Sequence, residues 1–193
     1  MKAPSAPGAT PLDPDEAAGL RPTSIATRGE LDAFEQANIL DAEQWASKRK
    51  HNDILSDEFI RELHRRMFDQ VWSWAGKYRT SDKNIGVPWP QVPVKVRELC
   101  DNTRYQVEHA TYAWDERGAR FHHRLVAIHP FPNGNGRHAR LMTDVLLFNH
   151  DQPLFTWGAR SAGPVAETRE RYLAALRAAD DLDYTALIAF VRT

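Results

Sequence analysis

The chain has 193 residues, 42% hydrophobic and 26% charged, a composition typical of one globular domain and not of a disordered chain. Its 25 Lys and Arg nearly balance 26 Asp and Glu, which disfavours nucleic acid as the main ligand. The single cysteine, Cys100, cannot form an intramolecular disulfide, and no stretch is long and apolar enough for a membrane span. These features predict a cytoplasmic protein without a membrane role.

The N-terminal segment differs in composition from the rest of the chain. Five prolines and few bulky apolar residues lie between Met1 and Pro22. Such a segment buries too little surface to offset the entropy of ordering. We therefore expect a flexible arm over residues 1–24 and one folded domain over residues 25–193.

Helical spacing of apolar residues dominates that domain. It predicts helices near 29–45, 57–71, 94–109, 115–128, 137–148, 167–179 and 183–192. Thr27, Ser56 and Asp183 are the predicted N-caps. Between residues 76 and 93, glycines and prolines interrupt β-prone pieces at 77–80 and 85–87, which favours a hairpin-like flap. The predicted fold is all-α with one small β-hairpin flap.

A loop between two of these helices carries the residues suited to chemistry. His129 precedes Pro130 and is expected at the exit of its helix. Gly134 and Gly136 can adopt positive φ, and the next helix begins directly after them. Its free N–H groups and positive dipole end therefore predict an anion site in this loop.

Two arginines support the same interpretation. Arg137 and Arg140 lie in the first helical turn, where a cation is unfavourable against the helix dipole by roughly 0.3–1 kcal/mol. Two guanidinium groups beside a glycine loop suit the polyphosphate of a nucleotide, and His129 could take a proton from an attacking hydroxyl. The alternative is an ordinary turn whose histidine only binds carbonyls at a helix end.

The order of these residues resembles a family signature. Residues 129–140 match the Fic pattern His-Pro-Phe-x-(Asp or Glu)-Gly-Asn-Gly-Arg-x-x-Arg at all specified positions except one. Residues 72–79 and 84–86 resemble the lead into the flap of that family, and Arg171 and Tyr172 with residues 183–191 resemble its C-terminal part. The resemblance covers roughly residue 31 to the end. Within the family, the chain looks most like small bacterial members called mobile mystery protein B.

This resemblance implies a function. Most characterised Fic proteins are largely helical and move AMP from ATP to a hydroxyl side chain of a target protein. By position, His129 would be the base and Phe131 the anchor of the loop. The phosphates would be bound by Gly134, Asn135, Gly136, Arg137 and Arg140. The implied partner is a protein with a Ser, Thr or Tyr hydroxyl.

The one departure from the signature is Asn133, where the family usually has the carboxylate that holds Mg²⁺. An amide oxygen can bind Mg²⁺ but adds no negative charge, so metal affinity should fall. Two interpretations stay open: an adenylyltransferase with weak metal binding, or a nucleotide-binding interaction module with little turnover. The module would belong to a toxin and antitoxin pair, and an antitoxin or a second copy is a candidate partner.

Two further features are implied by the resemblance. Lys83, Asn84, Ile85 and Gly86 would form the flap edge on which an extended target segment docks by strand addition. Glu35 is the nearest candidate for the inhibitory glutamate that many Fic proteins pair with the second arginine of the signature, here Arg140. Leu31 occupies the Ser or Thr position of that inhibitory pattern. The alternative is a solvated glutamate on a helix face.

Overall fold

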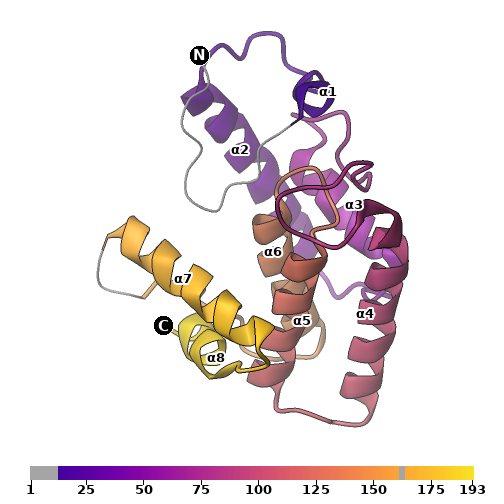
Figure 1. The fold of residues 1–193 in the computed structure, drawn as a ribbon, viewed down its shortest axis with the longest axis vertical. Coiled ribbons are helices and arrows are strands. Elements are labelled where there is room, and N and C mark those ends of the chain that lie inside the picture. Colours follow the sequence, from indigo (N-terminus) through magenta and orange to yellow (C-terminus); the bar gives the residue numbers. More distant parts are fainter. Residues whose placement is uncertain (1–12, 161–163) are drawn as a thin grey trace.

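The computed structural model describes residues 13–160 and 164–193, and they form a mostly helical fold (Figure 1). In chain order, its helices are α1 (Pro14–Ala17), α2 (Arg28–Ser47), α3 (Asp57–Phe68), the 3₁₀ helix η1 (Trp89–Gln91), α4 (Val92–Glu108), α5 (Trp114–Ile128), α6 (Asn135–Asn149), α7 (Val165–Asp180) and α8 (Thr185–Val191). None of the helices in these described residues is long and apolar enough to cross a membrane.

Side-chain caps explain where two of these helices begin. Thr27 Oγ1 accepts a hydrogen bond from the Glu30 N–H (3.2 Å), and Ser56 Oγ accepts one from the Phe59 N–H (3.2 Å). Both predicted N-caps are confirmed. For α8 the N-cap is Tyr184, one residue after the predicted Asp183, whose carboxylate accepts the Thr185 N–H (3.0 Å).

Helices that follow one another in sequence pack together around two apolar clusters. α2 packs on α3, α4 on α5, α5 on α6 and α7 on α8. Figure 1 shows α5 and α6 in the middle, with α7 and α8 on one side and α3 and α4 on the other. The helix predicted near 57–71 ends at Phe68, and Leu63, Met67 and Val71 of that range are fully buried in the larger cluster. This packing fixes both ends of the loop that joins α5 to α6.

The predicted β-hairpin flap is wrong. Residues 76–93, all of them described, contain no strand; their regular structure is η1 and the first two residues of α4. Pro88 and Pro90 have no N–H to donate to a ladder. The Arg79 guanidinium instead donates to the carbonyls of Ser81 (2.9 Å) and Val87. The flap is therefore an irregular loop held by one buried arginine.

Residues 13–21 pack along the chain that leads into this flap, while residues 1–12 of the predicted arm lie outside the described residues. The Arg21 N–H donates to the Val71 carbonyl (2.8 Å), and the Ser73 N–H donates to the Gly19 carbonyl (2.9 Å). Trp74 Nε1 donates to the Glu16 carbonyl (2.9 Å). The contacts fix α1 beside the flap. The domain boundary at residue 25 stays a prediction.

Candidate active site

The loop 129–134 is closed by one buried amide. Asn135 Nδ2 donates to the Phe131 carbonyl (2.8 Å), and its Oδ1 accepts the Phe131 N–H (2.9 Å). Phe131 is fully buried, and Asn135 is 3% exposed. The loop is thus anchored to the first residue of α6 and to the core, and both ends are rigid.

Gly134 is required by the fold at the start of α6. Its φ is +75°, and a Cβ at this position would lie 2.5 Å from the Phe68 ring. At Gly136, by contrast, a Cβ would meet no described atom within 4 Å apart from its chain neighbours and its own helix backbone. The N-cap residue of α6 is Gly134, which has no side chain to cap the helix. No N-cap side chain therefore occupies the N–H groups of its first turn, as an anion site needs.

His64 supports this loop from below, although the sequence did not indicate it as a site residue. Its Nδ1 accepts the Gly76 N–H (3.0 Å), so its Nε2 carries the hydrogen and donates to the Asn133 carbonyl (3.1 Å). Its ring stacks on Phe131 with centroids 3.7 Å apart. Burial holds the pKa of His64 well below its usual value. A neutral histidine thus links α3, the flap and the loop.

Arg79 is a second supporting residue. Its side chain is fully buried, and its Nε donates to the His129 carbonyl (2.7 Å). The Arg79 N–H donates to the Pro130 carbonyl (3.0 Å). Carbonyls that α5 leaves unpaired at its C-terminus are therefore bound by one guanidinium, which also fixes the flap.

His129 lies at the C-cap of α5 in the left-handed region, with φ +54°. It is only 5% exposed. Burial, followed by the positive charges of Arg79 and Lys83, lowers the pKa of His129 to about 4. The flap covers it closely, since a Cβ on Gly86 would lie 2.8 Å from the His129 Cβ. At neutral pH the imidazole is therefore uncharged and able to accept a proton.

Glu35 is buried, so its interpretation as a solvated glutamate is wrong. Its side chain is 8% exposed, and its Oε2 accepts a hydrogen bond from Arg137 NH1 (2.6 Å). Its Oε1 accepts one from Trp72 Nε1 (2.7 Å). The structure thus pairs Glu35 with the first arginine of the motif and not with Arg140.

Arg140 has a different environment. Its guanidinium lies over the rings of Tyr172 (4.7 Å) and Trp157 (5.9 Å). Within the described residues, no carboxylate lies within ion-pair distance of it, and its buried Nε has no hydrogen-bond partner. Of the two arginines predicted to need a negative partner, Arg137 is ion-paired in the protein. Arg140 forms no ion pair within the described residues; it lies over two aromatic rings, donates a hydrogen bond to Tyr172 and interacts electrostatically with Asp144.

The metal-binding potential of the loop is small. Asn133 Oδ1 accepts the Gly134 N–H (2.6 Å). The described chain contains no group of three His, Cys, Asp or Glu side chains that could hold a metal ion. One neutral amide oxygen that already accepts a hydrogen bond does not fit a resident Mg²⁺ site, because Mg²⁺ is usually held by carboxylates together with substrate phosphates.

The four predicted flap residues have different environments. Asn84, Ile85 and Gly86 are exposed, with Ile85 at 46%. The Lys83 side chain is 3% exposed, and its Nζ donates to Asp13 (2.7 Å) and to Glu16 (2.6 Å). The lysine therefore contacts α1 and its N-cap, and the neighbouring three residues face solvent.

Several curated proteins are similar to this chain in sequence. Protein adenylyltransferase fic-1 of Caenorhabditis briggsae is 34% identical over 152 residues, which cover 74% of this chain and 27% of the relative. A probable protein adenylyltransferase of Sinorhizobium fredii is 30% identical over 122 residues, covering 59% of this chain and 62% of the relative. The chain spans about a quarter of the length of the first of these relatives (27%).

The solved structures agree in fold. Fic-1 of Caenorhabditis elegans superposes with a TM-score of 0.67 at 26% identity, covering 91% of this chain and 51% of that structure. The N-terminal Fic domain of a putative cell filamentation protein from Bartonella quintana gives 0.71 at 13% identity, covering 92% and 91%. Residues 54–147 match the sequence family described as the Fic/DOC family. The chain therefore contains a Fic domain, which this match places at residues 54–147.

Proposed function

We propose that this protein is an adenylyltransferase that moves AMP from ATP to a hydroxyl side chain of a protein. The observation that carries the proposal is the arrangement of one rigid loop. That loop joins a buried neutral imidazole, His129, to a helix N-terminus whose N-cap residue is a glycine and where a Cβ on Gly136 would meet open space. Arg140 forms no ion pair with a carboxylate of the described chain. The base, the anion site and this arginine all belong to residues 129–140.

The phosphate roles follow from charge and backbone direction. The N–H groups at the start of α6, around Gly134, Asn135 and Gly136, would donate to the phosphates of the bound ATP. Arg140 adds a fixed guanidinium, held over two aromatic rings. Arg137 joins it once its bond to Glu35 is released. With the β and γ phosphates bound by these groups, the α phosphate is left for attack.

The reaction is a displacement at the α phosphorus. His129 takes the proton from the target hydroxyl, and the resulting oxygen forms a bond to phosphorus. The bond between the α phosphorus and the bridging oxygen breaks, and pyrophosphate leaves with that electron pair. Because burial keeps His129 neutral, the base needs no prior deprotonation at neutral pH. Most of the rate enhancement then comes from positioning and from electrostatic stabilisation of the phosphoryl oxygens.

Mg²⁺ enters this proposal with the substrate, as MgATP. The loop offers Asn133 in place of a carboxylate, and the phosphates of the nucleotide would supply most of the ligands. A Mg²⁺ ion would neutralise charge on those phosphates. We expect a higher Mg²⁺ requirement than an acidic residue at position 133 would give.

The exposed flap residues Asn84, Ile85 and Gly86 would contact the target. A segment lying along them would reach His129, because Gly86 touches that residue. The relatives named protein adenylyltransferase support a protein substrate. Glu35 would regulate the same site by holding Arg137 away from the phosphates.

A second candidate function is a Fic-shaped, nucleotide-binding interaction module of a toxin and antitoxin pair. Two observations favour it: the amide at position 133 and the carboxylate of Glu35 on Arg137. Both would reduce turnover and still leave the loop able to bind a nucleotide. An antitoxin or a second copy of the chain would then be its partner.

Labelled ATP separates the two candidates. Purified protein is incubated with ATP labelled at the α phosphate or at the γ phosphate, together with candidate targets. Transfer of the α label alone supports the adenylyltransferase. ATP binding without any covalent label supports the module, and transfer of the γ label contradicts both.

A further inference from the structure

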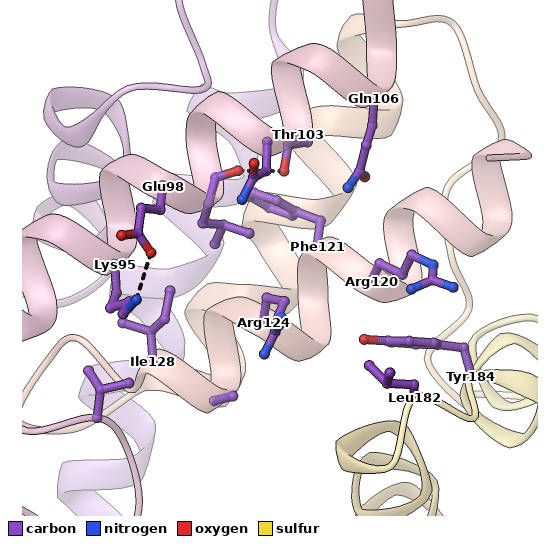
Figure 2. Close-up of a pocket in the computed structure, with 14 residues that line it drawn as sticks. Lys95, Glu98, Thr103, Gln106, Arg120, Phe121, Arg124, Ile128, Leu182 and Tyr184 are labelled. Carbon is purple, nitrogen blue, oxygen red and sulfur yellow. Dashed lines mark hydrogen bonds and ion pairs between the residues drawn. The ribbon is translucent and has the colours of Figure 1, made fainter. Parts of the chain in front are cut away.

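A second cavity lies beside the catalytic loop. It has a volume of about 360 Å³ and lies between α4, α5 and the loop that precedes α8 (Figure 2). Val87 and Ile128 line it next to the loop, and the Val87 N–H donates to the Ile128 carbonyl (3.4 Å). Ile128 directly precedes His129. None of the lining residues belongs to 129–140, so the cavity adjoins the catalytic base and is separate from the proposed phosphate site.

The cavity is positively charged. Its lining includes Lys95, Arg120 and Arg124 but only one carboxylate, Glu98. Lys95 Nζ bonds to Glu98 (2.8 Å). Arg120 bonds to Glu116 (2.7 Å) on its own helix. Figure 2 shows Arg124 between the α4 side chains and Leu182. This exposed guanidinium has no hydrogen bond or ion pair with any residue that the structure describes.

The remaining lining suits a peptide. Leu99, Phe121 and Ile128 form a buried apolar floor. The side-chain amides of Asn102 and Gln106 have no hydrogen-bond partner in the described part of the chain. A guanidinium fork binds a carboxylate through two parallel hydrogen bonds, and amides bind peptide groups. Apolar floor, amides and a single unpaired cation together fit an acidic side chain on a short extended segment.

We propose that this cavity binds an acidic segment of the protein substrate, with Arg124 contacting an Asp or Glu carboxylate. The assignment rests on the proposed function and deepens it by naming a specificity determinant. A target segment that leaves the flap at Gly86 and Val87 enters the cavity without crossing the phosphate site. The preferred hydroxyl would therefore lie near Asp or Glu in the target sequence.

Peptide binding tests the assignment without nucleotide. Three fluorescein-labelled peptides share one threonine and differ only in carrying Glu, Gln or Lys at the flanking positions. Their affinities are measured by fluorescence anisotropy for wild type, Arg124→Glu and Arg177→Glu. Arg177 is the matched control, an exposed arginine on α7 outside the cavity. We expect the Glu peptide to bind wild type about fivefold more tightly than the Lys peptide, as one partly exposed charge contact permits.

The charge reversal gives the decisive result. Arg124→Glu should invert the order so that the Lys peptide binds best, while Arg177→Glu keeps the wild-type order. Arg124→Gln, a milder change, should remove the preference for Glu over Gln. Equal affinity of wild type for all three peptides, or the same shift in Arg124→Glu and Arg177→Glu, would overturn the assignment.

The same peptides separate this inference from the proposed function. Binding is also measured with His129→Ala, which keeps the cavity. An acidic preference without AMP transfer supports the cavity assignment and contradicts the adenylyltransferase. Transfer that is equal for all three peptides supports the adenylyltransferase and contradicts the cavity assignment.

Discussion

Glu35 on α2 bonds to Arg137 on α6 at 2.6 Å, across 102 positions of sequence. The carboxylate is buried, and the guanidinium is 42% exposed. One arginine of the motif is therefore ion-paired inside the protein, while the other, Arg140, forms no ion pair in the described chain. A triphosphate would compete with Glu35 for Arg137 and would break no ion pair at Arg140.

Replacing Glu35 by Gln should strengthen ATP binding. The amide oxygen can still accept the hydrogen bond from Trp72 Nε1, so the core contact is kept. The Arg137 guanidinium loses its ion pair and becomes available to the phosphates. We expect an ATP affinity about tenfold higher, since a hydrogen bond to a charged group is worth roughly 1.5–3 kcal/mol and this one is half exposed. Isothermal titration of ATP measures it, with Asp41→Asn on the same helix as control. Unchanged affinity for ATP would show that the pair has no regulatory role.

Replacing Asn133 by Asp should lower the Mg²⁺ requirement. The new carboxylate keeps an oxygen for the Gly134 N–H and adds a negative charge at the proposed phosphate site. We expect faster AMP transfer at limiting Mg²⁺ and a smaller difference at saturating Mg²⁺. Transfer rates across a Mg²⁺ titration measure this, with the exposed Asn52→Asp as a control for added charge. No gain at limiting Mg²⁺ would contradict the proposed place of the metal.

The rate should depend little on pH near neutrality. The pKa of His129 is lowered to about 4, so the imidazole is the free base at all pH values well above that and becomes protonated only as the pH falls toward it. Rates at saturating MgATP should stay level between about pH 8 and about pH 6 and decline only at lower pH. A half-maximal rate close to pH 6.5 would mean that His129 is not held in this buried environment.

Removing the carboxylate of Glu16 should loosen the flap. Lys83 is buried between Asp13 and Glu16, and these contacts join α1 to the flap. Glu16→Gln leaves a buried ammonium with one acid, a loss of about 1 kcal/mol, which makes local opening roughly fivefold more frequent. Hydrogen exchange of residues 80–87 measures the opening, with the exposed Glu108→Gln as control. Equal exchange in the two variants would show that α1 does not hold the flap.

Local features of the fold could be predicted from the sequence. Thr27 and Ser56 begin helices because capping depends on neighbouring residues alone. The loop 129–140 was found for the same reason, since its glycines, prolines and arginines follow one another. The hairpin prediction failed because the Arg79 guanidinium, which belongs to the flap itself, binds the Ser81 and Val87 carbonyls that a second strand would have bound.

The supporting contacts of the site could not be predicted, because they join distant elements. His64 contacts Asn133 across 69 positions, and Glu35 contacts Arg137 across 102. One signal for His64 was present: it lies between Ile60 and Phe68 at spacings of four, on the apolar side of α3, where a polar side chain needs a buried partner. No comparable pattern marked the bonds between Lys83 and α1.

The most direct measurement compares ATP binding and AMP transfer in the same preparations of wild type and His129→Ala. If His129 is the base and the loop after it binds the triphosphate, the variant keeps its affinity for ATP. Its rate of AMP transfer falls by a factor of about 100 or more. Equal transfer by both proteins, or no ATP binding by either, would contradict the account.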